Sequence, residues 1–169
     1  MGFRPGDPLE ARLRYTRRCV DFAARLGVKI VTFHMGLLPG LAGPKQSAAA
    51  SFARTDDIAG KMGVVLRAQD AQNYYFVYRN TGGTSQLRIS KVVGGTETLL
   101  KFASIGNPAK NTFFQLGGKA QGSTLTLELG GVPKLTVSDA TFGSGQVGVR
   151  FGSTSNKLFR VDSFSASAE

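Results

Sequence analysis

Arginine and tyrosine side chains that could bind a hydroxyl-rich ligand recur through the middle of the sequence. The candidates are Arg67, Tyr75, Arg79, Arg88 and Arg150. An exposed ring can cover the apolar face of a pyranose, while polar side chains bind its hydroxyls. A guanidinium also pairs well with a carboxylate, so an acidic glycan is one expected ligand. The alternative is that the rings belong to a core and the arginines are solvated.

The acidic side chains stand singly, which argues against a hydrolytic site. Hydrolysis of a glycosidic bond uses two carboxyl groups that flank the bond. Glu97, Glu128, Asp139 and Asp162 each lack a nearby acidic partner in the sequence. We expect Glu128, on the outward face of its strand, to be solvated. A noncatalytic protein is therefore expected, with a glycoside hydrolase-like enzyme as the alternative.

The single cysteine and the single histidine offer little further chemistry. Cys19 cannot form an intrachain disulfide or a cysteine-based zinc cluster. With one histidine, His34, neither a Ser/His/Asp triad nor a Cys/His pair has support in the sequence. We expect Cys19 to pack as a small apolar side chain.

The net charge of +10 raises nucleic acid as a partner hypothesis. Residues 1–45 carry eight Lys/Arg and three acids, and residues 46–169 carry thirteen and eight. The basic residues of the second part are spread singly along its strands, so no specific nucleic-acid binding is expected. The apolar runs are far shorter than the roughly 20 residues that span a bilayer. Charged residues also interrupt the N-terminus where a signal peptide is apolar. Neither a membrane-spanning segment nor a signal peptide is therefore expected, and the compartment stays undetermined.

The first 36 residues predict a helix followed by a strand. Asp7 can cap a helix over residues 8–26, Pro8 fits its first position, and Gly27 can end it. The β-branched run at 28–33 predicts a buried strand. Residues 37–47, rich in glycine and proline, are the expected linker.

This segment resembles one helix-strand unit of the sugar phosphate isomerase/epimerase barrels. The resemblance rests on Asp7-Pro8 and on RRCVDFAARLGVKIVTFHMG at residues 17–36. In that family a histidine at the end of a strand can lie near the metal and the sugar, which the resemblance implies for His34. No further barrel units follow, so His34 has no carboxylate partners and a structural role is favoured. We expect a barrel-like fragment docked on the rest of the chain.

Short alternating runs separated by glycine-rich turns fill residues 48–169. The predicted strands are 48–54, 61–68, 73–79, 86–93, 98–103, 111–116, 123–129, 133–138, 146–152 and 158–164. Turns are expected at Gly94-Gly95, Gly117-Gly118 and Gly130-Gly131, among others. Alternation places Leu125, Leu127, Val147 and Val149 in one core. The pattern predicts an all-β antiparallel sandwich of two stacked sheets, with the N-terminal helix and strand appended.

Residues 61–164 resemble the concanavalin A-like lectin/glucanase, or laminin G-like, jelly roll. The resemblance rests on GVVLRAQDAQNYYF at 63–76, QLRISKVV at 86–93, STLTLELGG at 123–131 and FGSGQVGVR at 142–150. It implies a carbohydrate-binding or interaction module, and it implies Asp162 as a calcium ligand. The family's opening strands are absent, so an exposed edge is expected, paired by residues 28–33 or by a second copy in a homodimer. A structural or assembly fragment without ligand is the remaining alternative.

Overall fold

The structure is a computed structural model that describes residues 43–55, 59–153 and 159–168. The helix expected over 8–26, the strand expected over 28–33, Cys19 and His34 lie outside these residues. The described part contains no helix, and hence none that could cross a membrane. It consists of the strands β1 (Lys45–Arg54), β2 (Gly60–Ala68), β3 (Tyr74–Thr81), β4 (Gln86–Val93), β5 (Thr96–Ser104), β6 (Phe114–Gln121), β7 (Thr124–Leu129), β8 (Val132–Ser138), β9 (Gln146–Ser153) and β10 (Phe159–Ala168).

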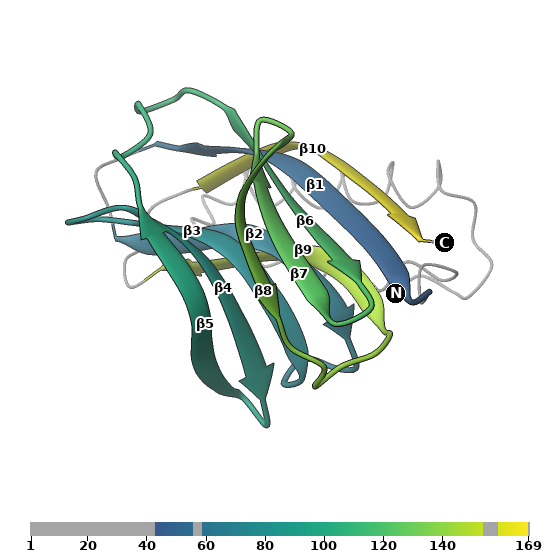
Figure 1. Cartoon of the computed structure of the whole chain (residues 1–169). Helices are drawn as coiled ribbons and strands as arrows, with labels where there is room; N and C mark the ends of the chain where they lie inside the picture. Colours follow the sequence, from purple (N-terminus) through teal and green to yellow (C-terminus); the bar gives the residue numbers. More distant parts are fainter. Residues whose placement is uncertain (1–42, 56–58, 154–158, 169) are drawn as a thin grey trace, which may run out of the picture. The chain divides into compact units, whose positions relative to one another are not determined.

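The strands form two antiparallel sheets that lie one over the other (Figure 1). Sheet A has the order β10-β1-β6-β7-β8, and sheet B has the order β5-β4-β3-β2-β9. The first described strand, β1, therefore lies between the last strand, β10, and β6. Three of its residues, Lys45 to Ser47, fall where the linker was expected. The two-layer antiparallel sandwich predicted from the alternation is confirmed.

The core lies between the facing sides of the two sheets. Alternate side chains from both sheets fill it because successive residues of a strand point to opposite faces. Leu125 and Leu127 are fully buried there and Val147 is 2% exposed, as the alternation predicted. The other fully buried core side chains are Phe52, Met62, Val64, Leu66, Tyr75, Val77, Ile89 and Leu116.

The turn expected at Gly117-Gly118 is wrong, because both glycines lie inside β6. A Cβ on Gly118 would lie 3.0 Å from a Val64 methyl and 3.1 Å from a Leu66 methyl of the opposite sheet. Glycine is therefore favoured here by the close approach of the two layers rather than by a turn. Strand β6 begins at Phe114, three residues later than the expected start at Asn111, and it continues through both glycines to Gln121.

Glu128 faces outward from sheet A as expected, but it is not solvated. The Lys119 ammonium donates to Glu128 Oε1 at 2.6 Å, and the Glu128 side chain is 12% exposed. Lys119 belongs to the neighbouring strand β6. Its ion pair with Glu128 therefore depends on the register between β6 and β7, in which Gly117 is opposite Glu128.

Candidate functional site

The five candidate residues do not gather in one place. Tyr75 and Arg79 face the interior, Arg67 lies buried at one end of the sandwich, and only Arg88 and Arg150 remain on the outward side of sheet B. Arg67, Tyr75 and Arg79 therefore lie off the surface that Arg88 and Arg150 share, for three separate physical reasons.

Arg67 leaves the outward face because the backbone bends at that point. The register between β2 and β9 shifts before Ala68, and Arg67 has a positive φ of 50°. Strict alternation would have placed it beside Lys61 and Val65, but the bulge turns it toward the sandwich end. Its guanidinium donates to the carbonyls of Gly122 (2.7 Å), Phe142 (2.8 Å) and Pro44 (2.6 Å). Arg67 is 1% exposed, and burial lowers its pKa.

Tyr75 is a core ring whose hydroxyl anchors the loop between β8 and β9. The hydroxyl donates to Asp139 Oδ1 at 2.6 Å and accepts from the Phe142 backbone N at 3.1 Å. Lys91 donates to the other oxygen of Asp139 at 2.9 Å. Burial alone would raise the pKa of Asp139, but hydrogen bonds from Thr141, Tyr75 and Lys91 outweigh it and hold that pKa well below its usual value.

Arg79 faces inward at the opposite end of the sandwich. Its Nε donates to Ser85 Oγ at 3.3 Å, Nη2 donates to the Gly106 carbonyl, and the guanidinium lies 4.8 Å from the centre of the Phe114 ring. Burial, together with the charge of nearby Arg54, lowers the pKa of Arg79 to about 10. Arg79 therefore holds the β5–β6 connection and has only 4% of its surface exposed.

Arg88 and Arg150 belong to a surface that we call the outer B face. Strand register places its members on one side of sheet B, away from the core. Its members include Lys61, Val65, Tyr74, Phe76, Tyr78, Arg88, Ser90, Val92, Glu97, Leu99, Phe102 and Arg150.

Aromatic rings form the floor of the outer B face. Phe76 and Tyr78 stack with centroids 4.3 Å apart and an interplanar angle of 13°. The Arg150 guanidinium lies 5.2 Å from the Phe76 ring centre and 5.4 Å from that of Tyr74, within cation–π range. The three rings are at most 5% exposed. They support the basic side chains above them rather than offering a free ring to a ligand.

One carboxylate, Glu97, lies within this face. Lys61 Nζ donates to Glu97 Oε2 at 2.6 Å, and the Tyr78 hydroxyl donates to Oε1 at 2.6 Å. Burial would raise the pKa of Glu97, but the hydrogen bonds from Lys61 and Tyr78 prevail and lower it. Glu97 is thus an ionised carboxylate whose two oxygens both have partners on this face.

The free ring of the outer B face is Phe102, which the sequence analysis did not single out. Phe102 is 51% exposed and is the register partner of Arg88, and Leu99 beside it is 43% exposed. Strict alternation through residues 96–103 groups Phe102 with Leu100, which packs on the core. A register shift between Ile89 and Ser90 reverses this, and the sequence carries no signal for it.

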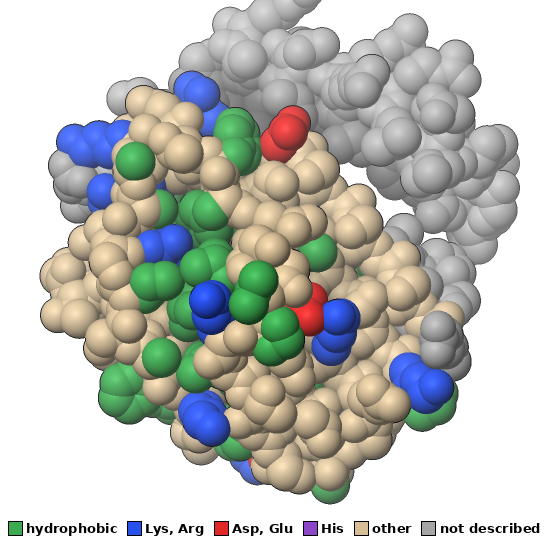
Figure 2. Space-filling view, turned by 45° about the horizontal axis from the view of Figure 1, so that its top comes forward, with side chains coloured by type: hydrophobic (Ala, Val, Ile, Leu, Met, Phe, Trp, Pro, Cys, Tyr) green, Lys and Arg blue, Asp and Glu red, His purple; other side chains and the backbone are tan. Residues whose placement is uncertain are grey.

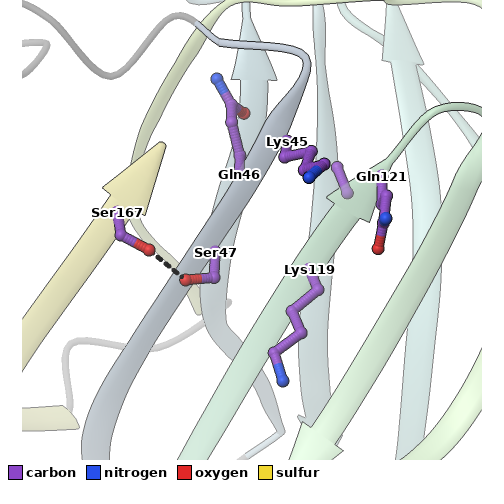
Figure 3. A pocket seen from close by; sticks show the side chains of 7 residues that line it. Lys45, Gln46, Ser47, Lys119, Gln121 and Ser167 are labelled. Atoms are coloured by element: carbon purple, nitrogen blue, oxygen red, sulfur yellow. Dashed lines mark hydrogen bonds between the residues drawn. The ribbon is translucent and has the colours of Figure 1, made fainter. Parts of the chain in front are cut away.

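A small polar pocket of about 210 Å³ lies on sheet A (Figure 3). Lys45, Ser47, Lys119, Gln121 and Ser167 line its mouth, together with Gln46 and Ala120. Its groups already have partners: Ser47 Oγ and Ser167 Oγ are 2.8 Å apart, and Lys119 is paired with Glu128. Gln46 Oε1 accepts from the Arg67 backbone N at 3.0 Å. No ring lines the pocket, so the outer B face is the better candidate site for a sugar.

Comparisons with known proteins give a fold but no family. No family model matches the chain, and no curated protein matches it. Among solved structures, the carbohydrate-binding module CBM66 of Bacillus subtilis is similar, with TM-score 0.64 and 16% identity over 76% of this chain and 78% of that one. Sheep galectin-11, in complex with glycerol, has TM-score 0.57 and 7% identity over 80% and 99%. The chain shares the two-sheet jelly-roll fold of these structures.

The same jelly roll also occurs inside larger proteins. The GH43 protein BlXynB of Bacillus licheniformis matches with TM-score 0.52 and 12% identity over 74% of this chain but 28% of that one. Nothing in these comparisons supports the resemblance of residues 7–36 to a sugar phosphate isomerase barrel. The finer concanavalin A-like or laminin G-like type is likewise not distinguished by them.

The jelly roll gives little support to the calcium and nucleic-acid hypotheses. Asp162 lies exposed on β10, and the described residues contain no group of three or more His, Cys, Asp or Glu that could hold a metal. On the face shown in Figure 2, Lys and Arg side chains stand apart among hydrophobic and neutral ones instead of forming a continuous strip. That distribution differs from the clustered basic patch that nucleic-acid binding favours.

Proposed function

We propose that this chain is a noncatalytic carbohydrate-binding module whose site is the outer B face. The observation that carries the proposal is the Arg88–Phe102 pair: Phe102, whose ring is exposed, lies directly opposite Arg88 on the neighbouring strand of the same surface. The ring would cover the apolar face of a sugar, and Arg88 would bind its hydroxyl groups. The similar structures named above include a carbohydrate-binding module and a galectin, which supports this function.

A hydrolytic role has less support at this surface. Glu97 is the one carboxylate that the described residues place on the outer B face, and Lys61 and Tyr78 hold it ionised. A general acid needs a raised pKa, and a glycosidase needs a second carboxyl group across the scissile bond. Neither condition is met there. The glycoside hydrolase-like alternative therefore predicts turnover of oligosaccharides, which we do not expect.

The test is binding to a panel of soluble polysaccharides, measured by affinity gel electrophoresis. Phe102→Ala should abolish the retardation that the parent protein shows. Phe113→Ala is the matched control, because Phe113 is 45% exposed and lies outside sheet B. Equal retardation of the parent and Phe102→Ala by every polysaccharide would reject the outer B face as the site. Absence of retardation by all of them would reject carbohydrate binding.

Self-association through an edge strand is a second proposal. Strand β10 is an outermost strand of sheet A among the described residues, and its Val161 is 43% exposed. The stretch Phe164–Ala168 carries no charge, whereas charged edges discourage pairing. Light scattering should give the mass of a dimer for the parent and of a monomer for Val161→Lys. A monomeric parent at all concentrations would contradict the dimer.

A further inference from the structure

We propose that the ligand is an acidic glycan whose chain lies across the strands of sheet B, with acidic groups at Arg88 and Arg150. This inference rests on the proposed carbohydrate-binding function. It adds the class of glycan that binds and the direction in which the glycan chain crosses the sheet.

The register places the two arginines in one row perpendicular to the strands. Arg150 is opposite Gly63, Gly63 is opposite Tyr78, Tyr78 is opposite Arg88, and Arg88 is opposite Phe102. Arg88 and Arg150 are separated by three strand spacings, so their Cα atoms lie roughly 14 Å apart. A single monosaccharide next to Phe102 would therefore leave Arg150 unused, whereas a chain extended along the row would reach it.

The two guanidinium groups have no acidic partner among the described residues. Arg88 donates to the neutral Gln86 Oε1, from Nε at 2.8 Å and from Nη2 at 2.5 Å. The Arg150 guanidinium lies over the Tyr74 and Phe76 rings. By contrast, Lys61, Lys91 and Lys119 each have a carboxylate within 2.9 Å. Of the basic side chains that the described residues place on the outer B face, Lys61 is thus neutralised by a carboxylate, whereas Arg88 and Arg150 are not.

Stacking leaves Arg150 ready to bind an anion. A guanidinium that lies over ring faces still directs its N–H groups outward in its own plane, where a carboxylate can accept two of them. The rings beneath also limit the rotamers of Arg150, so less conformational entropy is lost when a ligand binds. The side chain is exposed, which leaves that plane accessible.

The surface beside Arg150 is low enough for a chain to lie on it. Gly148 and Gly152 flank Arg150 on the same face of β9, and Gly63 faces it on β2. A Cβ added at Gly148 would have no atom within 4 Å, so space is open at that position. The Phe76–Tyr78 stack between the arginines is fully buried, with Arg150 over the Phe76 ring and Lys61 over the Tyr78 ring, so a chain would rest on these charged side chains and on the open position at Gly148.

The balance of charge on the face also favours an acidic ligand. Lys61, Arg88 and Arg150 are the basic side chains that the described residues place there, against the single acid Glu97. Because Lys61 already neutralises Glu97, the surplus belongs to the arginines. Binding should therefore weaken as salt screens the exposed charges.

The experiment compares ligands that differ only in charge. Oligogalacturonate and its methyl ester, sulfated dextran and dextran, and duplex DNA are titrated against the parent protein and against Arg88→Gln and Arg150→Gln. Arg160→Gln is the control, because Arg160 is also exposed but lies on β10 of the other sheet. Far-ultraviolet dichroism and thermal melts confirm that each variant is folded.

We expect at least one acidic carbohydrate to bind about 10-fold more tightly than its neutral counterpart. Arg88→Gln and Arg150→Gln should each lower the affinity for that carbohydrate about 10-fold, as expected for the loss of one charge-assisted contact. Arg160→Gln should keep the parent affinity. Neutral carbohydrates that bind as tightly as acidic ones, or Arg150→Gln that matches Arg160→Gln, would overturn this inference and leave the proposed function standing. DNA that binds with the same dependence on both arginines would overturn it as nonspecific attraction. If no carbohydrate binds, the proposed function and the inference fail together.

Discussion

Phe102 lies directly opposite Arg88, although the turn that joins their strands would by itself pair Arg88 with Lys101. The turn at Gly94-Gly95 sets Val93 opposite Thr96, and this register holds as far as Ser90 and Leu99. Leu100 is then an extra residue, and it packs on the core. Because one added residue reverses the direction of the side chains beyond it, Phe102 faces outward with Arg88.

Truncation of Phe102 should separate binding from stability. A ring that is 51% exposed contributes little to the fold, so Phe102→Ala should change the free energy of unfolding by less than about 0.5 kcal/mol. The same variant should lose its carbohydrate binding. Urea denaturation and affinity electrophoresis on one preparation check both. A loss of several kcal/mol would show that Phe102 is structural.

Removal of the Arg67 side chain should destabilise the sandwich although it is far from the outer B face. Its guanidinium satisfies the carbonyls of Gly122, Phe142 and Pro44. Because these acceptors lose their partner, Arg67→Ala should cost about 3 kcal/mol or more of unfolding free energy. Arg88→Ala is the control and should cost less than about 1 kcal/mol, since the hydrogen-bond partner of Arg88 among the described residues is Gln86, a neighbour on its own strand. Comparable losses in the two variants would contradict the structural role of Arg67.

Asp139 should make stability depend on acid pH. Its pKa is lowered in the folded protein, so its contribution is present above the unfolded value of about 3.9 and is lost as pH falls through the lower, folded value. Asp139→Asn should therefore cost about 2 kcal/mol at pH 7. The difference in unfolding free energy between the parent and Asp139→Asn should shrink below about pH 4.

Urea denaturation midpoints from pH 7 to pH 2.5 check this dependence. Tyr75→Phe serves as the comparison, because it removes one hydrogen bond to Asp139 without removing the carboxylate. It should retain most of the acid dependence. A difference between parent and Asp139→Asn that is constant over the whole pH range would refute the assignment.

A methyl group at Gly118 should strain the interface between the sheets. Its Cβ would lie 3.0–3.3 Å from side chains of Val64, Leu66 and Val77. Overpacking of this kind costs about 1–3 kcal/mol. Gly148→Ala is the matched control on the other sheet, because its Cβ would meet nothing within 4 Å. Thermal melts should place Gly118→Ala below the parent and Gly148→Ala close to it; the opposite order would be incompatible with the packing described.

Much of the strand pattern could be predicted because it depends on local chemistry. Alternation along 123–129 and 146–152 identified β7 and β9, since the apolar side chains of each strand lie on one face. Gly94-Gly95 and Gly130-Gly131 do form turns, and each has a positive φ that glycine adopts without strain. Gly117-Gly118 looks the same in the sequence and lies within a strand, because the reason for glycine there is a contact with the opposite sheet.

The sequence by itself determined that this chain forms paired antiparallel layers with Leu125, Leu127 and Val147 inside, because a two-residue period allows no other economical burial. Only the tertiary structure decided which polar and aromatic side chains share a surface. Bulges near Arg67 and at Leu100 each shift the alternation by one residue, and such shifts arise from packing between strands rather than from the residues concerned. They remove Arg67 from the outer B face and bring Phe102 to it, beside Arg88.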